Sequence, residues 1–391
     1  MNDWLEVLYG MAIIHFLAVL FWEILGHYAF FRMPCLSKQE CAEPEKWPSV
    51  MIIFAAKDEQ REIEQAVRSM LNIEYPNLQY TAVNDRSTDS TGEILDRLAR
   101  EDPRLNVVHI NELPEGWLGK NHALHQAAMA SNTDYLLFTD ADVSFDVECV
   151  KRAIRYTEQH AVDHLTMLPR VLMPNLILNA FVVFFFKTFI VYYQAWRVSN
   201  PRSKAFLGIG AFNMVRGNVL REIGGFKKIR MEVVDDLLLG KLIKQSGFRQ
   251  EALVARDDIS VPWYGSVREM VVGLDKNTYA GVNYNPLMLI VMVMVLALMF
   301  LWPFVGVFLF DAEVQALFAL ICGVLIVSTG WMALRMNLNP LISVCIPVIV
   351  PIFLFTIMRA GIIFYIRGGI KWRDTLYTRQ QLASGRLEEF D

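Results

Sequence analysis

Long apolar stretches lie at both ends of the chain, and a more polar segment separates them. The first stretch runs from Leu5 to Phe31 and is interrupted only by scattered polar residues. The others follow the polar segment, at about Pro286 to Phe310, Val314 to Leu334 and Leu341 to Tyr365. Each has nearly the roughly 20 apolar residues needed to cross a bilayer, or more. We therefore predict a transmembrane anchor over residues 1–32, about three transmembrane helices over 286–366 and a basic tail over 367–391.

The segment between Trp47 and about Asn285 alternates short apolar runs with amphipathic stretches. The runs of strand length are Ser49–Ala56, Leu78–Val83, Leu105–Ile110 and Tyr135–Thr139. The stretches with helical spacing between them are Arg61–Asn72, Ser90–Arg100 and Asn121–Ala130. This alternation predicts βαβ units and an α/β fold with a mostly parallel sheet. We expect residues 47–285 to form one domain that includes helices lying at the membrane interface.

The composition agrees with a membrane protein. Hydrophobic residues make up 54% of the chain and charged residues 20%, and the mean hydropathy is +0.30. A net charge of −4 argues against a general nucleic-acid binder. The five cysteines are scattered without the spacing of a metal site.

Flanking charges predict the orientation of the first span. Asp3 and Glu6 lie at its start, whereas Arg32 and Lys38 follow it. Basic residues favour the cytoplasmic side, so we expect a multi-pass protein of the cell (inner) membrane with a cytosolic middle domain. Three complete carboxy-terminal spans would place the basic tail outside. Prolines within the last apolar stretch can break it, so the side of the tail stays open.

Acidic residues follow three of the four predicted strands. Asp58–Glu59 follow the first, Asp85 the second, and Asp140 and Asp142 the fourth. Ligands of open α/β sheets bind beyond the carboxyl ends of the strands. If the chain turns at Ala141, the last two carboxylates can converge on one Mg²⁺ or Mn²⁺ ion, which often bridges carboxylates to substrate phosphates. No glycine-rich dinucleotide motif or P-loop follows the first strand.

Five motifs resemble those of family 2 glycosyltransferases and occur in the same order. They are Ala55–Glu59, Val83–Asp89, Gly116–Lys120, Asp140–Asp142 and Asp235–Gly240. The chain is most similar to the membrane enzymes of that family that glycosylate lipids, near the hopene-associated, carotenoid and ceramide glycosyltransferases. The resemblance implies a GT-A-like nucleotide-sugar fold, a nucleotide-diphosphate sugar donor, a lipid acceptor, a divalent metal ion and inversion at the sugar carbon.

The resemblance also implies roles for single residues on the donor side. Asp85 matches an acid that contacts the nucleotide base, and Asn84 replaces the acid before it. Asp58 and Glu59 lie where the family places Asn-Glu beside the nucleotide. Lys120 opens a helix after a glycine-containing loop, where a cation and helix amides can bind a diphosphate.

Asp235 and Asp236 match the family's acidic pair, in which the second residue is the catalytic base. Two adjacent carboxylates among apolar neighbours should raise the pKa of one of them. We expect Asp236 to be the base and Asp235 to support it. Gly208, Gly210 and Gly224–Gly225 frame Arg216 and resemble the family's loop on the acceptor side; the alternative is that these glycines only form turns.

Two further basic residues, Arg268 and Lys276, could hold the donor diphosphate. The alternative is that they anchor an amphipathic helix at the membrane interface, together with Trp263 and Tyr264. The apolar stretch Leu176–Trp196 is expected to be an interfacial helix, because a crossing there would separate Asp140 from Asp236.

These expectations describe a membrane enzyme that transfers one sugar to a lipid. The Gln-x-x-Arg-Trp motif of processive polysaccharide synthases is missing near residues 261–281. The alternatives are a processive polysaccharide synthase, a polyprenyl-phosphate sugar synthase and a catalytically silent membrane scaffold.

Overall fold

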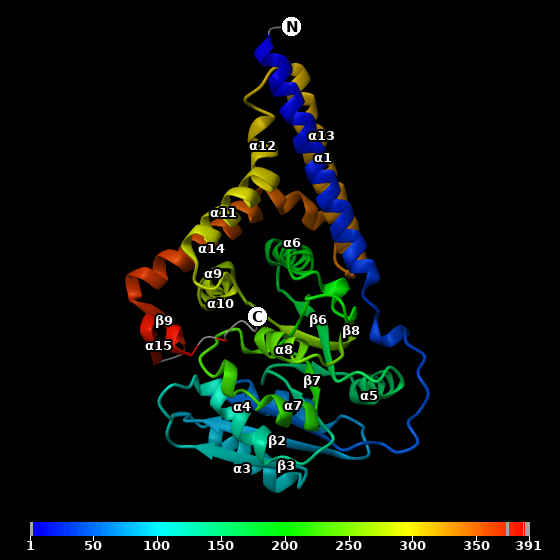
Figure 1. Cartoon of the computed structure of the whole chain (residues 1–391), viewed down its shortest axis with the longest axis vertical. Coiled ribbons are helices and arrows are strands. Elements are labelled where there is room, and N and C mark those ends of the chain that lie inside the picture. The colour runs from blue at the N-terminus through cyan, green and yellow to red at the C-terminus, as the bar shows by residue number, and fades with distance from the viewer. Residues whose placement is uncertain (1–2, 373–374, 386, 388–391) are drawn as a thin grey trace. The chain divides into compact units, whose positions relative to one another are not determined.

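The computed structural model describes residues 3–372, 375–385 and 387, which divide into two compact units (Figure 1). The sheet unit consists of residues 33–172, 193–262 and 378–391. The helical unit consists of residues 1–32, 173–192 and 263–377. Each unit is therefore built from segments that are far apart in the sequence.

An eight-stranded sheet forms the centre of the sheet unit, with the order β3-β2-β1-β4-β7-β6-β8-β5. The first four strands in this order, β3, β2, β1 and β4, pair in parallel with one another. Strand β7 is antiparallel to both of its neighbours, β4 and β6. The predicted mostly parallel α/β sheet and its four predicted strands are confirmed. The strands are β1 (Val50–Ala56), β2 (Leu78–Asp85), β3 (Leu105–Ile110), β4 (Tyr135–Phe138), β5 (Ser144–Phe145), β6 (His164–Leu172), β7 (Asn213–Arg216) and β8 (Gln250–Pro262).

Helices cover both faces of this sheet because side chains of a strand alternate between faces. On β1, Ile52 and Phe54 pack into the core beneath α2 (Ile63–Leu71), α3 (Thr91–Glu101) and α5 (Cys149–Gln159). Ile53 packs into the opposite core beneath α4 (Gly119–Ala130), α7 (Gly217–Ile223) and α8 (Asp235–Gln245). The remaining helical segments of the unit are η1 (Leu36–Lys38), η2 (Ala195–Arg197), η3 (Lys227–Ile229) and α15 (Arg379–Ser384).

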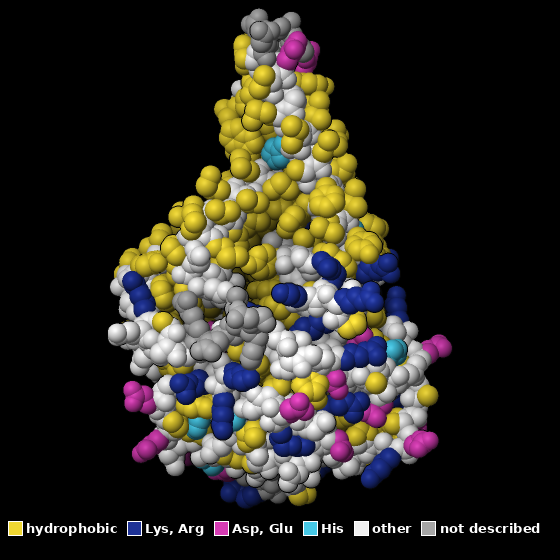
Figure 2. Space-filling view, in the orientation of Figure 1, with side chains coloured by type: hydrophobic (Ala, Val, Ile, Leu, Met, Phe, Trp, Pro, Cys, Tyr) yellow, Lys and Arg dark blue, Asp and Glu magenta, His cyan; other side chains and the backbone are white. Residues whose placement is uncertain are grey.

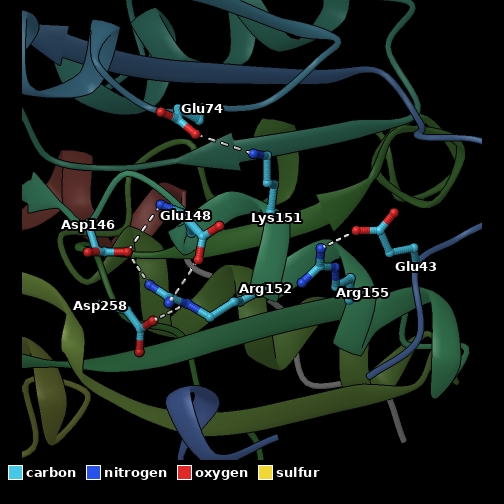
Figure 3. Close-up of polar contacts among 8 residues, drawn as sticks. All are labelled: Glu43, Glu74, Asp146, Glu148, Lys151, Arg152, Arg155 and Asp258. Carbon is cyan, nitrogen blue, oxygen red and sulfur yellow. Dashed lines mark hydrogen bonds and ion pairs between the residues drawn. The ribbon is translucent and has the colours of Figure 1, made fainter. Parts of the chain in front are cut away.

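Ion pairs connect α5 to the rest of the sheet unit (Figure 3). Arg152 contacts Asp146, and its Nε atom lies 2.8 Å from a carboxylate oxygen of the buried Asp258 on β8. Arg155 reaches Glu43 in the segment before β1, at 2.5 Å. These arginines are balanced by acids, which argues for a structural role in holding α5 against β5 and β8.

The helical unit contains four helices that are long and apolar enough to cross a membrane, among the residues described. They cover Glu6–Arg32, Pro286–Gly306, Ala312–Arg335 and Pro340–Arg367. Side chains such as Phe21, Val327 and Ile366 are largely exposed, and hydrophobic side chains cover these helices in Figure 2. The elements are α1 (Asp3–Arg32), α6 (Leu176–Tyr192), α9 (Val267–Gly273), α10 (Asp275–Gly281), α11 (Pro286–Leu296), η4 (Ala297–Leu301), α12 (Trp302–Gly306), α13 (Ala312–Arg335), η5 (Pro340–Cys345), α14 (Ile346–Arg367), β9 (Gly369–Trp372) and β10 (Thr375–Thr378).

A buried ion pair joins α6 to the long helices α1 and α13, which lie side by side (Figure 1). Lys187 on α6 donates to both carboxylate oxygens of Glu23 on α1, at 2.7 and 2.6 Å. Ser328 on α13 donates to the same carboxylate. Gly26 makes room for the lysine, because a Cβ atom there would lie 2.8 Å from Cγ of Lys187. The charges compensate each other, as buried charges must.

Candidate active site

The acidic motifs meet at one edge of the sheet. Strand β4 ends at Phe138, and the chain turns at Ala141 and Asp142, as expected. The end of β1 lies beside the ends of β4 and β2, since Ile53 pairs with Phe138 and Ala56 with Asn84. The residues that follow β1, β2 and β4 therefore gather at the carboxyl edge of the sheet.

Lys120 connects two of the predicted acidic motifs. Its Nζ atom lies 2.8 Å from Oδ1 of Asp140, after β4, and 3.3 Å from Oδ2 of Asp235, at the start of α8. Burial alone would lower the pKa of Lys120, but the charges of Asp140, Asp235 and Asp236 outweigh it and raise the pKa above its ordinary value. Lys120 therefore remains a cation, which fits it to bind an anion at this edge.

Asp236 is an unusually basic carboxylate. Burial and the adjacent charge of Asp235 raise its pKa to about 7, although Lys120 opposes the shift. Its Oδ1 atom accepts a hydrogen bond from the backbone N–H of Leu237 at 2.8 Å. A carboxylate whose pKa lies near neutral pH can both accept and release a proton there, as a general base requires.

Two glycines allow the acids to come close together. A Cβ atom on Gly208 would lie 1.8 Å from the backbone oxygen of Asp236. A Cβ atom on Gly210 would lie 2.6 Å from Oδ2 of Asp140 and 3.4 Å from Oδ2 of Asp236. Any side chain at either position would push the loop away from α8. These glycines therefore set the approach of Asp140 to Asp236.

Asp142 lies close enough to Asp140 for the charge of Asp140 to act on it. Burial and the charge of Asp140 raise the pKa of Asp142 to about 7, with a smaller contribution from Glu59. The described residues contain no group of three or more side chains arranged to hold a metal ion. Two carboxylates suit Mg²⁺ or Mn²⁺ when substrate phosphates and water supply the other oxygen ligands.

Asp85 is the last residue of β2 and is buried. Arg86 donates to both of its carboxylate oxygens, at 2.8 and 3.1 Å. Gly119 lies directly against it, since a Cβ atom there would be 2.3 Å from Oδ2 of Asp85. Asp85 is thus next to the start of α4, where Lys120 follows.

Asp58 helps to hold the two strand-end loops together. Its backbone is in the left-handed region, with φ of 54°. Its carboxylate accepts the backbone N–H of Thr88 at 2.7 Å, and its own N–H donates to Ser87. Glu59 donates its backbone N–H to Thr91 at 2.8 Å, and its charge acts on Asp142. A structural role for Asp58 is therefore established beside its predicted contact with a nucleotide.

Arg268, Lys276 and Arg216 are the other basic residues singled out in the sequence. Arg268, on α9, and Lys276, on α10, belong to the helical unit, and Nζ of Lys276 lies 4.7 Å from the centre of the Trp372 ring. Their expected contact with a diphosphate stays a prediction. Arg216 pairs with Tyr135, at the opposite end of β4 from Asp140, and binds Glu158 at 3.0 Å. It is separate from the acid cluster that Gly208 and Gly210 approach.

The family model of glycosyl transferase family 2 matches residues 51–238. The chain contains a family 2 glycosyltransferase domain. The match begins in β1 and ends in α8, and it includes all the acidic residues of the cluster.

Some of the known proteins with similar sequences carry the names of lipid-glycosylating enzymes. The chain is 37% identical over 97 residues to a beta-monoglucosyldiacylglycerol synthase of Nostoc sp., which covers 24% of this chain and 20% of that protein. It is 28% identical over 131 residues to a 4,4'-diaponeurosporenoate glycosyltransferase of Staphylococcus haemolyticus, covering 34% of each. The aligned part thus spans a fifth to a third of these relatives.

A solved structure supports the GT-A-like fold predicted for the glycosyltransferase domain. A mannosyltransferase from Pyrobaculum calidifontis, in complex with GDP-Man and Mn²⁺, superposes with a TM-score of 0.54. The superposition covers 91% of this chain and 99% of that one, at 17% sequence identity. At that identity the likeness concerns the fold.

A buried polar network that could not be predicted from the sequence holds the backbone of Asp236 in place. His164 on β6 hydrogen-bonds Oδ1 of Asn213 on β7, and Nδ2 of Asn213 donates to the backbone oxygen of Asp236 at 3.2 Å. The other ring nitrogen of His164 lies 2.5 Å from Nε2 of Gln250 on β8. Gln250 in turn accepts the backbone N–H of Leu207 at 3.0 Å. Three strands of the sheet unit thereby fix the start of α8 and the loop that contains Gly208 and Gly210.

This network predicts a loss of stability in acid. Burial lowers the pKa of His164 from 6.5 to about 4, although its hydrogen bond to Oδ1 of Asn213 opposes the shift. Between these values the unfolded chain binds a proton that the folded protein does not. The contribution of His164 to the free energy of unfolding is therefore complete above pH 6.5. It decreases as the pH falls towards 4, by about 2 kcal/mol between pH 7 and pH 5.

Thermal unfolding of the purified protein at pH 7.5 and pH 5 measures this effect. Raised carboxylate pKa values at Asp142 and Asp236 act in the opposite direction, so the comparison is made with a His164→Gln variant. The wild type should lose more stability on acidification than the variant does. Equal losses in both proteins would contradict the assignment.

Proposed function

We propose that the protein transfers one sugar from a nucleotide-diphosphate sugar to a lipid acceptor, with inversion at the sugar carbon. The observation that carries the proposal is the bridge by Lys120 between Asp140 and Asp235, which places a cation and the acidic pair of α8 at one sheet edge. The names of the relatives and the four long apolar helices support a lipid acceptor.

Asp236 is the proposed general base. It accepts the proton of the acceptor hydroxyl as that oxygen attacks the sugar carbon and the bond to the diphosphate breaks. Its pKa of about 7 leaves a large fraction ionised at neutral pH, and the buried position keeps it reactive. Asp235 supports this state by its charge and by its contact with Lys120.

The other residues at the carboxyl edge of the sheet are proposed to bind the nucleotide-sugar donor. Asp140 and Asp142 would hold Mg²⁺ or Mn²⁺ on the diphosphate, and the ion would offset the charge that develops on the leaving group. Lys120 adds a second positive charge for the diphosphate. Asp85 is assigned to the nucleotide base, and Asp58 and Glu59 to the nucleotide beside it.

Lipid analysis tests this function. Membranes that contain the protein are incubated with radiolabelled UDP-glucose or GDP-mannose, and lipid extracts are analysed by mass spectrometry. One added hexose on a lipid, absent from an Asp236→Asn control, is the expected result. A labelled polymer would favour a processive polysaccharide synthase, and a sugar attached to a polyprenyl phosphate would favour a polyprenyl-phosphate sugar synthase. Unchanged lipids would contradict the proposal.

We further propose that the glycosyltransferase domain faces the cytosol and that α14 does not cross the membrane. The segments directly before residue 263 (193–262) and directly after residue 377 both belong to the sheet unit, so the segment between them makes an even number of crossings. α14 contains Pro351 within the helix and packs against the short helices α9 and α10 and against α6. Crossings by α1, by α11 with α12, and by α13 satisfy this condition and leave the basic tail in the cytosol.

Reporter fusions test this topology. Alkaline phosphatase fused after Phe310 should be active, whereas the same enzyme fused after Leu338 or at the carboxyl terminus should be inactive. Green fluorescent protein at the same sites should give the reverse pattern. An active phosphatase at the carboxyl terminus would show that α14 crosses.

A further inference from the structure

The segment that follows β10 is part of the sheet unit. Residues 378–385 and Leu387 belong to the sheet unit, whereas β9 and β10 before them belong largely to the helical unit. Helix α15 begins with a capping box, in which Thr378 and Gln381 hydrogen-bond each other's backbone N–H groups. Leu382 is 2% exposed. The segment is therefore an ordered part of the sheet unit.

This segment contacts the loop that leads into α8. The backbone N–H of Leu387 donates to Oε1 of Glu232 at 2.8 Å. A Cβ atom on Gly385 would lie 2.5 Å from Cβ and Cγ of Met231, so Gly385 is tightly packed against that side chain. Leu387 also packs against the apolar core that α4 and α8 share. The contact combines close packing with a hydrogen bond to a nearly buried carboxylate.

The contacted loop joins the two halves of the proposed catalytic centre. Nδ2 of Asn121, next to Lys120, donates to the backbone oxygens of Ile229 and Glu232 at 2.8 and 2.9 Å. The backbone N–H of Leu118 donates to the backbone oxygen of Arg230 at 2.9 Å. Glu232 stands three residues before Asp235. The loop is thus held from α4 on one side and by the carboxy-terminal segment on the other.

We propose that residues 378–387 act as a positioning element for Asp235 and Asp236. By holding Met231 and Glu232, they fix where α8 begins, and hence the distance from its acidic pair to Lys120. This inference rests on the proposed role of Asp236 as base. It gives the carboxy-terminal segment a part in catalysis without contact with substrate.

Two changes in the full-length protein test the inference. Gly385→Val places a branched side chain against Met231, and Glu232→Ala removes the acceptor for the N–H of Leu387. Each should lower kcat about tenfold, because small displacements of catalytic groups have large effects on rate. The KM for the donor should change by less than about threefold, because the interaction lost matters in the transition state.

Controls separate positioning from folding. Glu232→Gln keeps an acceptor oxygen and should recover most of the activity that Glu232→Ala loses, and the exposed Gln380→Ala should behave as wild type. Wild-type kcat in both test variants, alongside an inactive Asp236→Asn, would overturn the inference and leave the proposed function intact. A loss of activity that only follows the loss of folded protein would also overturn it. Transfer retained by Asp236→Asn would overturn the base assignment and this inference with it.

Discussion

Replacing Asp236 by Asn should lower kcat at least about 100-fold, because the variant cannot accept the proton of the attacking hydroxyl. The amide keeps the shape of the side chain and an oxygen that can accept the N–H of Leu237. Donor binding depends on other residues, so the KM for the nucleotide sugar should stay nearly constant. Initial rates of lipid glycosylation in detergent micelles, at several donor concentrations, measure both quantities.

The pH dependence of the transfer rate is a second test of Asp236 as the general base. Because the pKa of Asp236 is raised to about 7, the wild-type rate should fall as the pH drops below 7 and approach about tenfold per pH unit. Asp257→Asn is the matched control, since Asp257 is an exposed aspartate on β8 outside the cluster. If Asp236→Asn and Asp257→Asn are equally active, Asp236 is not the base.

Replacing Asp142 by Asn should weaken binding of the divalent metal ion at the donor site, so that at least about tenfold more Mn²⁺ is needed for half-maximal activity. The variant retains Asp140 but loses one of two carboxylates. Activity is measured after treatment with a chelator, followed by titration with Mn²⁺ or Mg²⁺.

The wild-type requirement for metal should also depend on pH. Burial and Asp140 raise the pKa of Asp142 to about 7, and a metal ion binds the ionised carboxylate, so protons compete with it below that pH. The half-maximal Mn²⁺ concentration should therefore increase as the pH falls from 7.5 to 6. A requirement that is equal in the wild type, Asp142→Asn and Asp257→Asn would exclude a metal role for Asp142.

Much of the sheet could be predicted because it follows from local patterns. Buried parallel strands such as Val50–Ala56 appear as short apolar runs, and amphipathic helices separate them. The antiparallel strand β7 was not foreseen. It is four residues long, and its position between β4 and β6 depends on pairing between distant segments.

The candidate site was predictable to a similar degree. The strand rule and the family motifs pointed to Asp140 and Asp235, and both contact Lys120. The supporting contacts were not predictable, because they join positions far apart in the chain. His164 and Asn213 are 49 residues apart, and His164 and Gln250 are 86 apart. Leu387 and Glu232 are separated by 155 residues.

The ion pair between Glu23 and Lys187 has a consequence for how the protein is made. The ribosome delivers α1 to the membrane long before α6, so Glu23 at first lacks the lysine that neutralises it in the finished protein. An unpaired acid in the bilayer costs about 3 kcal/mol. Because the compensating lysine lies 164 residues further along the chain, we expect the packing of α1 in the helical unit to be completed only after α6 has been synthesised.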